Sequence, residues 1–284
     1  MIVEKIKDLN VAIVENDQFS LSEIFHENTK LHDIDRDFFY NIDIILKTPY
    51  ILKRIAKAYK AYPGYTAITL PEVKEDNLLK KLIKKRRSER AYSGKQIELQ
   101  ELADLLHFSL GITGTIKGLN DIELTLRAYP SAGALYPIEA YIIVFNVKSL
   151  DKGIYHYNVN KHLLELIEPG DYKEHLAKIC LSKDIMEDAN VLIILTSIFK
   201  RATIKYGIRG YRFALIEAGI VGQNITLVAE SLGLGSCMLG GFFDDEIHNV
   251  LKVDGVNEAV VNVMTVGRKG EKESEREGVE RGEK

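Results

Sequence analysis

Two short segments of the chain combine residue types that suit a phosphate group and a flat ring. Residues 86–92 read Arg-Arg-Ser-Glu-Arg-Ala-Tyr, and residues 130–137 read Pro-Ser-Ala-Gly-Ala-Leu-Tyr-Pro. Three guanidinium groups and a hydroxyl within five residues can bind a phosphate bidentately and can stabilise negative charge at a ring edge. Small residues ahead of a strand let the backbone approach a flat ring. The candidate residues are Arg86, Arg87, Ser88 and Arg90, and Pro130, Ser131, Ala132, Gly133, Ala134 and Leu135.

Each segment also has a simpler interpretation, which the sequence leaves open. Cations at the end of a helix usually form a solvated surface, and a small turn between prolines can simply lead into a strand. Residues 233–242, Gly-Leu-Gly-Ser-Cys-Met-Leu-Gly-Gly-Phe, are equally ambiguous. Because this segment follows a long helix rather than opening one, it does not match the dinucleotide-binding fingerprint, and a Rossmann domain is not expected. It can supply a bare backbone amide that points at a ring nitrogen.

The elements that must position these residues show in the apolar pattern. Spacing of three and four residues predicts helices over 78–87, 97–110, 172–181, 211–232 and 244–251. Continuous apolar runs predict buried strands at 140–147, 190–196 and 259–266, and a polar turn between two runs predicts a hairpin over 154–167. Residues 1–77 show no strong helical period, and we expect an appended segment that is largely irregular.

Composition restricts the classes of protein to which the chain can belong. Its 284 residues are 46% apolar and 28% charged, which is typical of a globular protein. The sequence contains no run of 18 apolar residues, so it predicts no membrane-spanning helix. Its net charge of −3 gives no general attraction to nucleic acid. The first residues do not resemble a secretory signal, so we expect a cytoplasmic protein.

Cysteine and histidine usage predicts neither a disulfide framework nor a metal site. Cys180 and Cys237 are the only cysteines, and we expect both to be buried free thiols. The seven histidines show no metal-ligand spacing, and the acidic residues 244–246 are typical of the first turn of a helix. Residues 270–284 contain ten charged side chains and no aromatic one, so we expect a disordered tail.

Taken in order, the motifs resemble the flavin-dependent nitroreductase superfamily. They are the segments 86–92 and 130–137, Lys-Tyr-Gly-x-Arg-Gly-Tyr-Arg-Phe at 205–213, Glu-Ala-Gly at 217–219 and Gly-Leu-Gly-Ser-Cys at 233–237. More narrowly, the chain resembles the SagB-type dehydrogenase branch, which includes the azoline oxidases of peptide-toxin biosynthesis. The resemblance spans about residues 78–268, and residues 26–31 are similar to the N-terminal extension of that branch. We therefore divide the chain into an N-terminal extension (1–77), an FMN-binding domain (78–269) and a charged tail (270–284).

The resemblance implies an α+β nitroreductase-like fold, in which helices flank a central, mostly antiparallel sheet. It implies a homodimer with FMN at the subunit interface. Arg86 and Ser88 would hold the phosphate and ribityl chain, and Arg87 beside them is also implied as a cofactor-binding residue. Arg90 would face the N1 and O2 edge of the flavin, and Arg268 would add a phosphate contact. The turn 130–135 would contact the flavin of the neighbouring subunit. The remaining cofactor residues implied are Met238, Leu239, Gly240 and Gly241, with the Gly240 amide donating to flavin N5.

The resemblance also marks candidates for proton transfer. Lys205 and Tyr206 stand where azoline oxidases carry a Lys-Tyr pair implicated in proton abstraction, and a lysine withdrawn from water beside a flavin could act as a base. The alternative is a pair of solvated residues ahead of a helix. Glu217, Gln223 and Asn224 are expected to be buried and hydrogen-bonded. Many members of the branch carry His after Glu-Ala-Gly, but this chain has Ile220 there.

The implied chemistry is a two-electron redox reaction with hydride transfer at flavin N5. The first hypothesis is a dehydrogenase or azoline-type oxidase that acts on a modified peptide or small molecule, with Lys205 or Tyr206 as the base. The second is a nitro- or quinone reductase that takes electrons from NAD(P)H. The third is a flavin-binding scaffold without turnover. No metal, nucleic acid or membrane is expected to take part.

Overall fold

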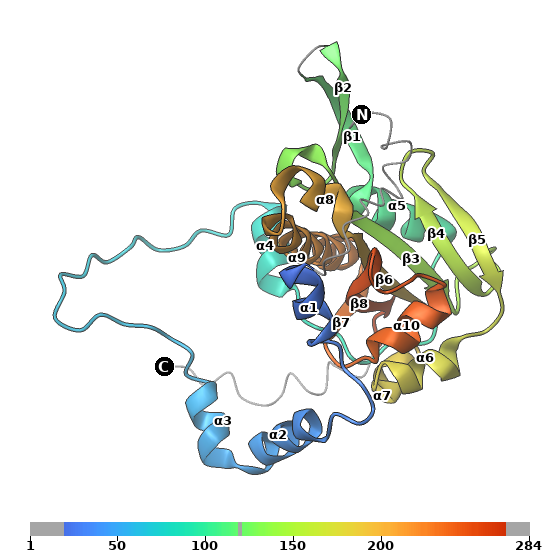
Figure 1. Cartoon of the computed structure of the whole chain (residues 1–284). Coiled ribbons are helices and arrows are strands. Elements are labelled where there is room, and N and C mark those ends of the chain that lie inside the picture. Colours follow the sequence, from blue (N-terminus) through green and yellow to red (C-terminus); the bar gives the residue numbers. More distant parts are fainter. Residues whose placement is uncertain (1–19, 119–120, 271–284) are drawn as a thin grey trace.

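The computed structural model describes residues 20–118 and 121–270 and has one central sheet (Figure 1). Its six strands lie in the order β5-β4-β3-β6-β8-β7, and every neighbouring pair is antiparallel. The strands are β3 (Ile138–Val144), β4 (Gly153–Asn158), β5 (Leu163–Pro169), β6 (Val191–Ile198), β7 (Leu234–Leu239) and β8 (Glu258–Arg268). The expected α+β fold is confirmed, and the predicted strands and hairpin lie where the apolar runs placed them.

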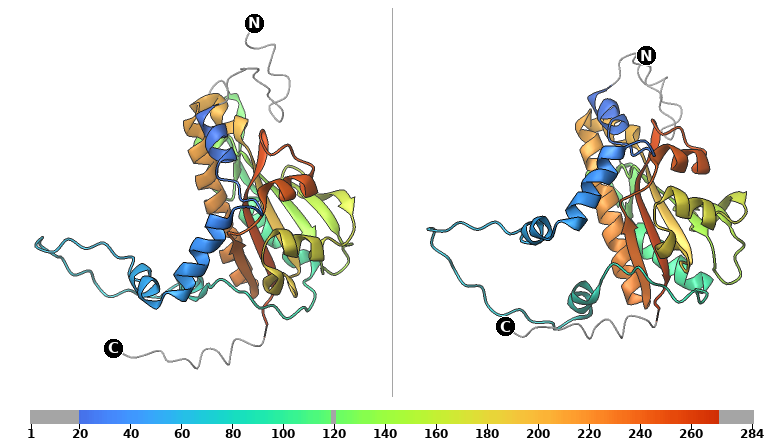
Figure 2. Two further views of the ribbon diagram at one scale, coloured as in Figure 1. Left: turned by 60° about the horizontal axis from the view of Figure 1, so that its bottom comes forward. Right: turned by 90° about the horizontal axis from the view of Figure 1, so that it is seen from below.

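Helices cover both faces of this sheet (Figures 1 and 2). One face carries α5 (Leu99–Leu110) and α9 (Arg209–Ser231), and the other carries α6 (Lys173–Ile179), α7 (Lys183–Met186) and α10 (Asp244–Leu251). Along β6, Ile193 and Leu195 belong to the core under α5 and α9, whereas Ile194 belongs to the opposite core. Because successive strand side chains point to opposite faces, two buried faces produce the continuous apolar runs of the sequence.

α9 is a core helix that runs across the molecule. Within the described ranges it is the one helix long and apolar enough to cross a membrane, and half of the relevant window is buried inside the fold. It packs against α5, α4 (Leu78–Lys85) and β7. α8 (Phe199–Tyr206) precedes it, and Gly207, at a φ of 56°, makes the turn between the two helices.

In the part of the chain after α4, the helix α8, the strand β7 and a separate two-stranded ribbon lie where the sequence analysis predicted neither helix nor strand. The ribbon consists of β1 (Ile112–Lys117) and β2 (Glu123–Arg127). In β7, Gly235 lies so close to the backbone of residues 86–92 that an added Cβ would be 2.7 Å from the Cβ of Glu89. The sequence left this segment ambiguous, and in the structure its glycine permits two chain segments to lie side by side.

The expectation of an irregular N-terminal segment is wrong for residues 20–55. These residues form α1 (Leu21–Glu27), α2 (Arg36–Lys47) and α3 (Pro49–Ile55). Ser20 begins α1 with a capping box, in which its hydroxyl accepts from the Glu23 N–H and the Glu23 carboxylate accepts from the Ser20 N–H. Residues 271–284 of the expected tail lie outside the described residues.

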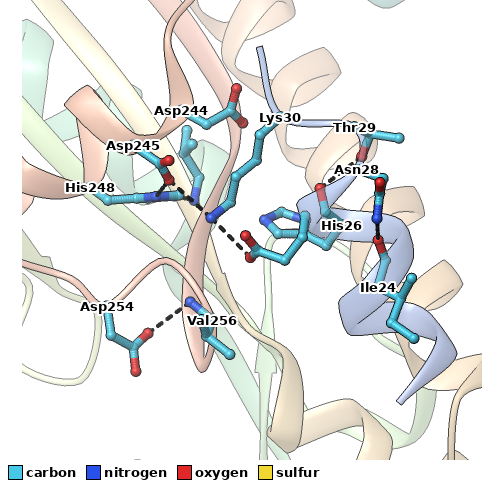
Figure 3. Close-up of polar contacts among 12 residues, drawn as sticks. Ile24, His26, Asn28, Thr29, Lys30, Asp244, Asp245, His248, Asp254 and Val256 are labelled. Atoms are coloured by element: carbon cyan, nitrogen blue, oxygen red, sulfur yellow. Dashed lines mark hydrogen bonds and ion pairs between the residues drawn. The ribbon is translucent and has the colours of Figure 1, made fainter. Parts of the chain in front are cut away.

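A buried polar cluster fastens α1 to the body (Figure 3). Lys30 Nζ lies 2.9 Å from a carboxylate oxygen of Glu27 and 2.9 Å from one of Asp245, although its side chain is only 5% exposed. His26 is buried against the ring of Phe199, and its Nδ1 lies 3.2 Å from the Tyr211 hydroxyl. Burial, followed by the charge of Lys30, lowers the pKa of His26 to about 4. The N-terminal extension therefore docks with a neutral histidine in its contact surface.

This docking predicts a loss of stability in mild acid. The unfolded His26 binds a proton below its usual pKa of 6.5, whereas the folded residue resists protonation until about pH 4, so stability falls as the pH drops from 6.5 towards 4. We expect the free energy of unfolding, measured by urea titration, to be lower by about 1–2 kcal/mol at pH 5 than at pH 7.5 after allowance for solvent screening. His26→Gln should weaken this dependence without abolishing it, because burial also lowers the pKa of His248. An equal pH dependence in His26→Gln would contradict the assignment.

Candidate functional site

The basic segment 86–90 leaves α4 and runs along the edge strand β7. The Glu89 N–H donates to the Ser236 carbonyl at 3.0 Å, and the buried Tyr92 hydroxyl lies 2.8 Å from Thr265 Oγ1. These contacts fix the backbone while the side chains of Arg87, Ser88 and Arg90 remain exposed. The structure therefore presents the predicted cluster to solvent from a rigid support.

The guanidinium groups of Arg86, Arg87 and Arg90 form no ion pair with a carboxylate of the described residues. Arg87 Nη1 donates to the carbonyls of Lys84 and Arg86 at 2.7 and 2.8 Å, and Arg90 Nη1 lies 3.4 Å from the Ser88 carbonyl. Three uncompensated charges beside one hydroxyl attract an anion, and guanidinium groups match phosphate oxygens bidentately. The donor set fits a phosphate.

Arg268 differs from this cluster in its surroundings. Its Nη1 and Nη2 lie 2.9 and 2.6 Å from the two carboxylate oxygens of Glu101. The Arg268 N–H donates to Asn190 Oδ1 at 2.8 Å, which anchors the end of β8. A ligand phosphate would have to compete with Glu101 for this guanidinium. The predicted phosphate contact of Arg268 stays a prediction.

The end of β7 provides an open stretch of backbone. Met238 is 41% exposed and Leu239 is buried, and Gly240 and Gly241 follow directly. A Cβ added at Gly240 would meet no atom within 4 Å, so its peptide group is accessible to a ligand. Ser236 forms a backbone β-bridge with Ser88. It lies four residues before Gly240, which is about 13 Å along an extended strand. This edge is long enough for a phosphate at one end and a ring at the other.

The structure brings together two candidate groups that are far apart in the sequence: the turn 130–135 and the pair Lys205 and Tyr206. Gly133 has a φ of +67°, and a Cβ added there would lie 2.7 Å from Lys205 Nζ and 2.6 Å from Tyr206 Oη. Glycine is thus required for the backbone angle and for the close approach of both side chains. Lys205 Nζ and Tyr206 Oη make no hydrogen bond to the described residues, and Lys205 Nζ lies 5.3 Å from the centroid of the Tyr206 ring. Both polar groups are available to a ligand.

Glu217 of α9 holds this turn in place. Its Oε1 accepts from the Ser131 hydroxyl at 2.9 Å and from the Ala132 N–H at 3.2 Å. Its Oε2 is buried and has no hydrogen-bond partner among the described residues, and burial raises the pKa of Glu217. Asn224 donates to the Ala128 carbonyl at 3.0 Å. The expected hydrogen-bonding roles of Glu217 and Asn224 are confirmed, whereas Gln223 is exposed.

The two walls of the candidate site lie on different sides of one chain. The basic segment lies beside the edge strand β7 and Gly240 directly follows it, whereas the turn leads into β3 on the far side of β6 and β8. Three strand spacings separate β7 from β3, about 14 Å, and α9 packs over the strands between them. A single copy therefore cannot close both walls around the same ring.

One face of α9 is bare and suits contact with another helix. Its exposed residues recur at helical spacing: Arg212, Leu215, Ile216, Gly219 and Gln223. Ile216 is 58% exposed, and a Cβ added at Gly219 would meet nothing within 4 Å. A small residue within an apolar stripe allows close approach of a second helix.

The described residues contain no group of three or more His, Cys, Asp or Glu that could hold a metal ion. Cys180 and Cys237 are free and buried, as the sequence analysis predicted.

Comparison with known proteins agrees with the motifs. The model of the Nitroreductase family matches residues 83–268. A protein of Methanocaldococcus jannaschii classified as a nitroreductase is 36% identical over 202 residues, which cover 71% of this chain and 96% of that protein. The microcin B17-processing protein McbC of Escherichia coli is 31% identical over 133 residues, which cover 45% of this chain and 49% of McbC. The chain therefore spans about half the length of this relative. The resemblance to the SagB-type branch of peptide-toxin processing proteins is confirmed.

A solved structure extends the similarity beyond the nitroreductase domain. A chain of the E. coli microcin synthetase McbBCD complex with truncated pro-MccB17 bound superposes with a TM-score of 0.61. The two chains are 21% identical, and the superposition covers 88% of this chain and 87% of that one. At this identity the similarity concerns the fold alone. Its coverage exceeds the range matched by the family model, so it includes part of the chain outside residues 83–268.

The hydrogen bonds of Glu217 predict that this residue sets the position of the turn. Glu217→Ala should lower the free energy of unfolding by about 1–3 kcal/mol, because two donors of the turn lose their acceptor. Glu217→Gln keeps an acceptor and reproduces the shape of the protonated acid, so its loss should be smaller. Urea denaturation of both variants checks the order, and equal losses would contradict the proposed role of the Oε1 contacts.

Proposed function

The chain belongs to the nitroreductase family, and from this premise we propose that it is an FMN-dependent oxidoreductase that works as a homodimer in the cytoplasm. When bound, FMN supplies two-electron chemistry by accepting or giving a hydride at N5. The observation that carries the proposal is the set of three uncompensated guanidinium groups on the edge that ends at the open Gly240 backbone.

In the proposed complex each residue of this edge would have a binding role. Arg86 and Ser88 would hold the phosphate and the ribityl chain with Arg87 beside them, and Arg90 would face the pyrimidine edge, where its positive charge would favour a reduced ring. The Gly240 amide would donate to N5, and Met238, Leu239 and Gly241 would contribute to the same part of the site. Arg268 contributes only if the phosphate displaces Glu101 from it.

A second copy completes the site because its turn supplies the missing wall. Residues Pro130 to Leu135 of the partner would cover the ring that Gly240 of the first copy binds. The bare stripe of α9 supports this arrangement, since two such stripes can pack about a two-fold axis with Gly219 at the close approach. The turn carries Lys205 and Tyr206 with it, so the partner also delivers the candidate proton-transfer groups.

We propose that the substrate is a modified peptide or small molecule with an azoline-like ring. Two observations support this class: the similarity to a microcin-processing protein, and a cavity of 540 Å³ beside Gly240. Residues 28–31 of the N-terminal extension and Phe242 line this cavity, next to the position proposed for N5. Lys205 or Tyr206 would remove the proton that leaves the substrate together with the hydride.

A nitro- or quinone reductase that uses NAD(P)H is the second candidate. The relative classified as a nitroreductase, which the chain covers over 96% of its length, favours this alternative. In that reaction no side chain is needed beyond those that bind the cofactor. A flavin-binding scaffold without turnover would bind FMN and fail in both reactions.

The purified protein should be yellow, with flavin absorbance between 300 and 550 nm, and anaerobic addition of NADPH or NADH separates the candidates. Bleaching by either nucleotide supports the reductase, whereas absorbance that persists supports a dehydrogenase reduced by its own substrate.

Arg86→Ala should weaken FMN binding by about 1.5–3 kcal/mol, roughly 10- to 150-fold in Kd, through loss of a charge-assisted contact. Lys81→Ala, an exposed cation on the same helix, should bind FMN normally. Failure of the wild type to take up added FMN would refute the proposal.

Replacement of Lys205 or Tyr206 tests the first candidate directly. With a thiazoline model compound as substrate, Lys205→Ala or Tyr206→Phe should lower kcat by about 10²–10⁴ while FMN stays bound, because general-base catalysis contributes on that order. Lys200→Ala is the matched control, since it removes a cation of α8 that does not approach Gly133. Full activity in both Lys205→Ala and Tyr206→Phe would exclude them as the base.

A further inference from the structure

A long exposed segment joins the N-terminal helices to α4. Residues 52–81 include no buried residue, and residues 56–77, here called the arm, contain no helix or strand. Figures 1 and 2 show the arm leaving the body after α3 and returning at α4. Its large apolar side chains are almost fully solvated: Tyr59 89%, Tyr62 63%, Tyr65 78%, Ile68 86%, Leu70 83% and Val73 86% exposed. Solvated apolar side chains at this density indicate a surface that another molecule covers.

The arm has few contacts of its own to stabilise it. Within it, the rings of Tyr62 and Tyr65 lie 5.9 Å apart, and Lys60 Nζ lies 4.8 Å from the centroid of the Tyr62 ring. At its end, Lys80 pairs with Asp76. Fixing the backbone costs about 1–2 kcal/mol per residue, which contacts of this kind cannot offset over 22 residues. Ordering the arm therefore requires a second surface.

The β1–β2 ribbon offers a surface of the same kind. Ile116 pairs with Leu124, and Leu126 lies two residues along β2, so the three side chains share one face of the ribbon. They are 53%, 37% and 38% exposed. The opposite face carries Thr115 and Thr125, which pair with each other. A two-stranded ribbon is only marginally stable in water without a cover on its apolar face.

The arm cannot be assigned to the ribbon of its own chain, because the two leave the body in different directions in Figure 1. The ribbon lies beside the turn 130–135, and the arm returns to α4 at the phosphate end of the β7 edge. Before the arm, residues 28–31 and Ile34, Asp35 and Phe38 line the cavity at Gly240. The segment from residue 28 to Arg86 thus brackets both ends of the proposed cofactor edge. In the proposed dimer the turn 130–135 of the partner reaches this edge. Because the ribbon lies beside that turn, the partner's ribbon would lie near the arm.

We propose that the arm of one copy wraps the apolar face of the β1–β2 ribbon of the second copy and so encloses the shared cofactor site. The inference rests on the proposed function, which requires a second copy at this edge. Three tyrosines and three aliphatic side chains of the arm are available to cover the three partly exposed apolar side chains of the ribbon face. Lys57 and Lys60 of the arm also complement Asp121 and Glu123 at the end of the ribbon.

Engineered cysteines test this contact in the full chain. Leu124→Cys is combined, one pair at a time, with Tyr65→Cys, Ile68→Cys or Leu70→Cys, and the proteins are oxidised and separated without reductant. The native cysteines are buried, so background cross-linking is low. We expect at least one pair to give a reductant-sensitive band at twice the chain mass of 32.1 kDa. Thr125→Cys, on the opposite face of the ribbon, is the matched control and should give none.

The remaining outcomes overturn the proposal. A cross-link within one chain would show that the arm binds its own ribbon, and equal dimer bands for Leu124→Cys and Thr125→Cys would show contact without a specific face. Absence of any cross-link in a protein that binds FMN would refute the arm contact and leave the proposed function intact, whereas absence of FMN binding in the wild type would refute the function itself. As a second measurement, replacing residues 57–74 by a Gly-Ser linker should reduce the hydrogen-exchange protection of residues 112–127 without loss of FMN.

Discussion

A single helix, α9, determines where every part of the candidate site can lie. Glu217 accepts the hydrogen bonds that hold the turn, Gly222 accommodates Met238, and Glu230 lies 2.7 Å from Lys269 and 3.3 Å from Lys85, just before the basic segment. The same helix stands between the two walls that it positions. Because α9 is amphipathic, its buried face contacts the parts of the site and its exposed face is available to a second copy.

Ion pairing divides the arginines of this region into two groups. Arg268 is held by Glu101, and Arg201 is held by Glu139 and the Tyr136 carbonyl, so their charges are compensated where they lie. Arg86, Arg87 and Arg90 lack such partners in the described chain, although their backbone is fixed against β7. A guanidinium group without a carboxylate partner can form charge-assisted hydrogen bonds to a bound phosphate. Fixed backbone with uncompensated charge is the arrangement expected of an anion site.

The N-terminal extension packs against the nitroreductase domain through α1 and the residues that follow it, whereas its later part is exposed to solvent. His26, Lys30 and the backbone of Leu31 fasten it to α9 and α10 through buried contacts. Beyond them, α2 exposes Phe38 and Leu46, and the arm exposes its tyrosines. The docked part contributes to the cavity at Gly240, and the bare part has the composition of an interface. The extension thus links the proposed substrate pocket to the proposed contact with a second copy.

The sequence by itself determined the strands β3 to β6 and β8, the helices α5 and α9 and the chemical character of the site. A strand that is buried on both faces of the sheet has a continuous apolar run in its sequence. Clustered arginines indicate an anion-binding site from the sequence alone. It did not determine β7, where Gly235 packs closely against Glu89, or the ribbon β1–β2, or the helices α1–α3. Only the tertiary structure placed Lys205 and Tyr206 over Gly133, paired Arg268 with Glu101 and separated the two walls by α9. These relations depend on contacts between residues distant in the chain, which local spacing and composition do not encode.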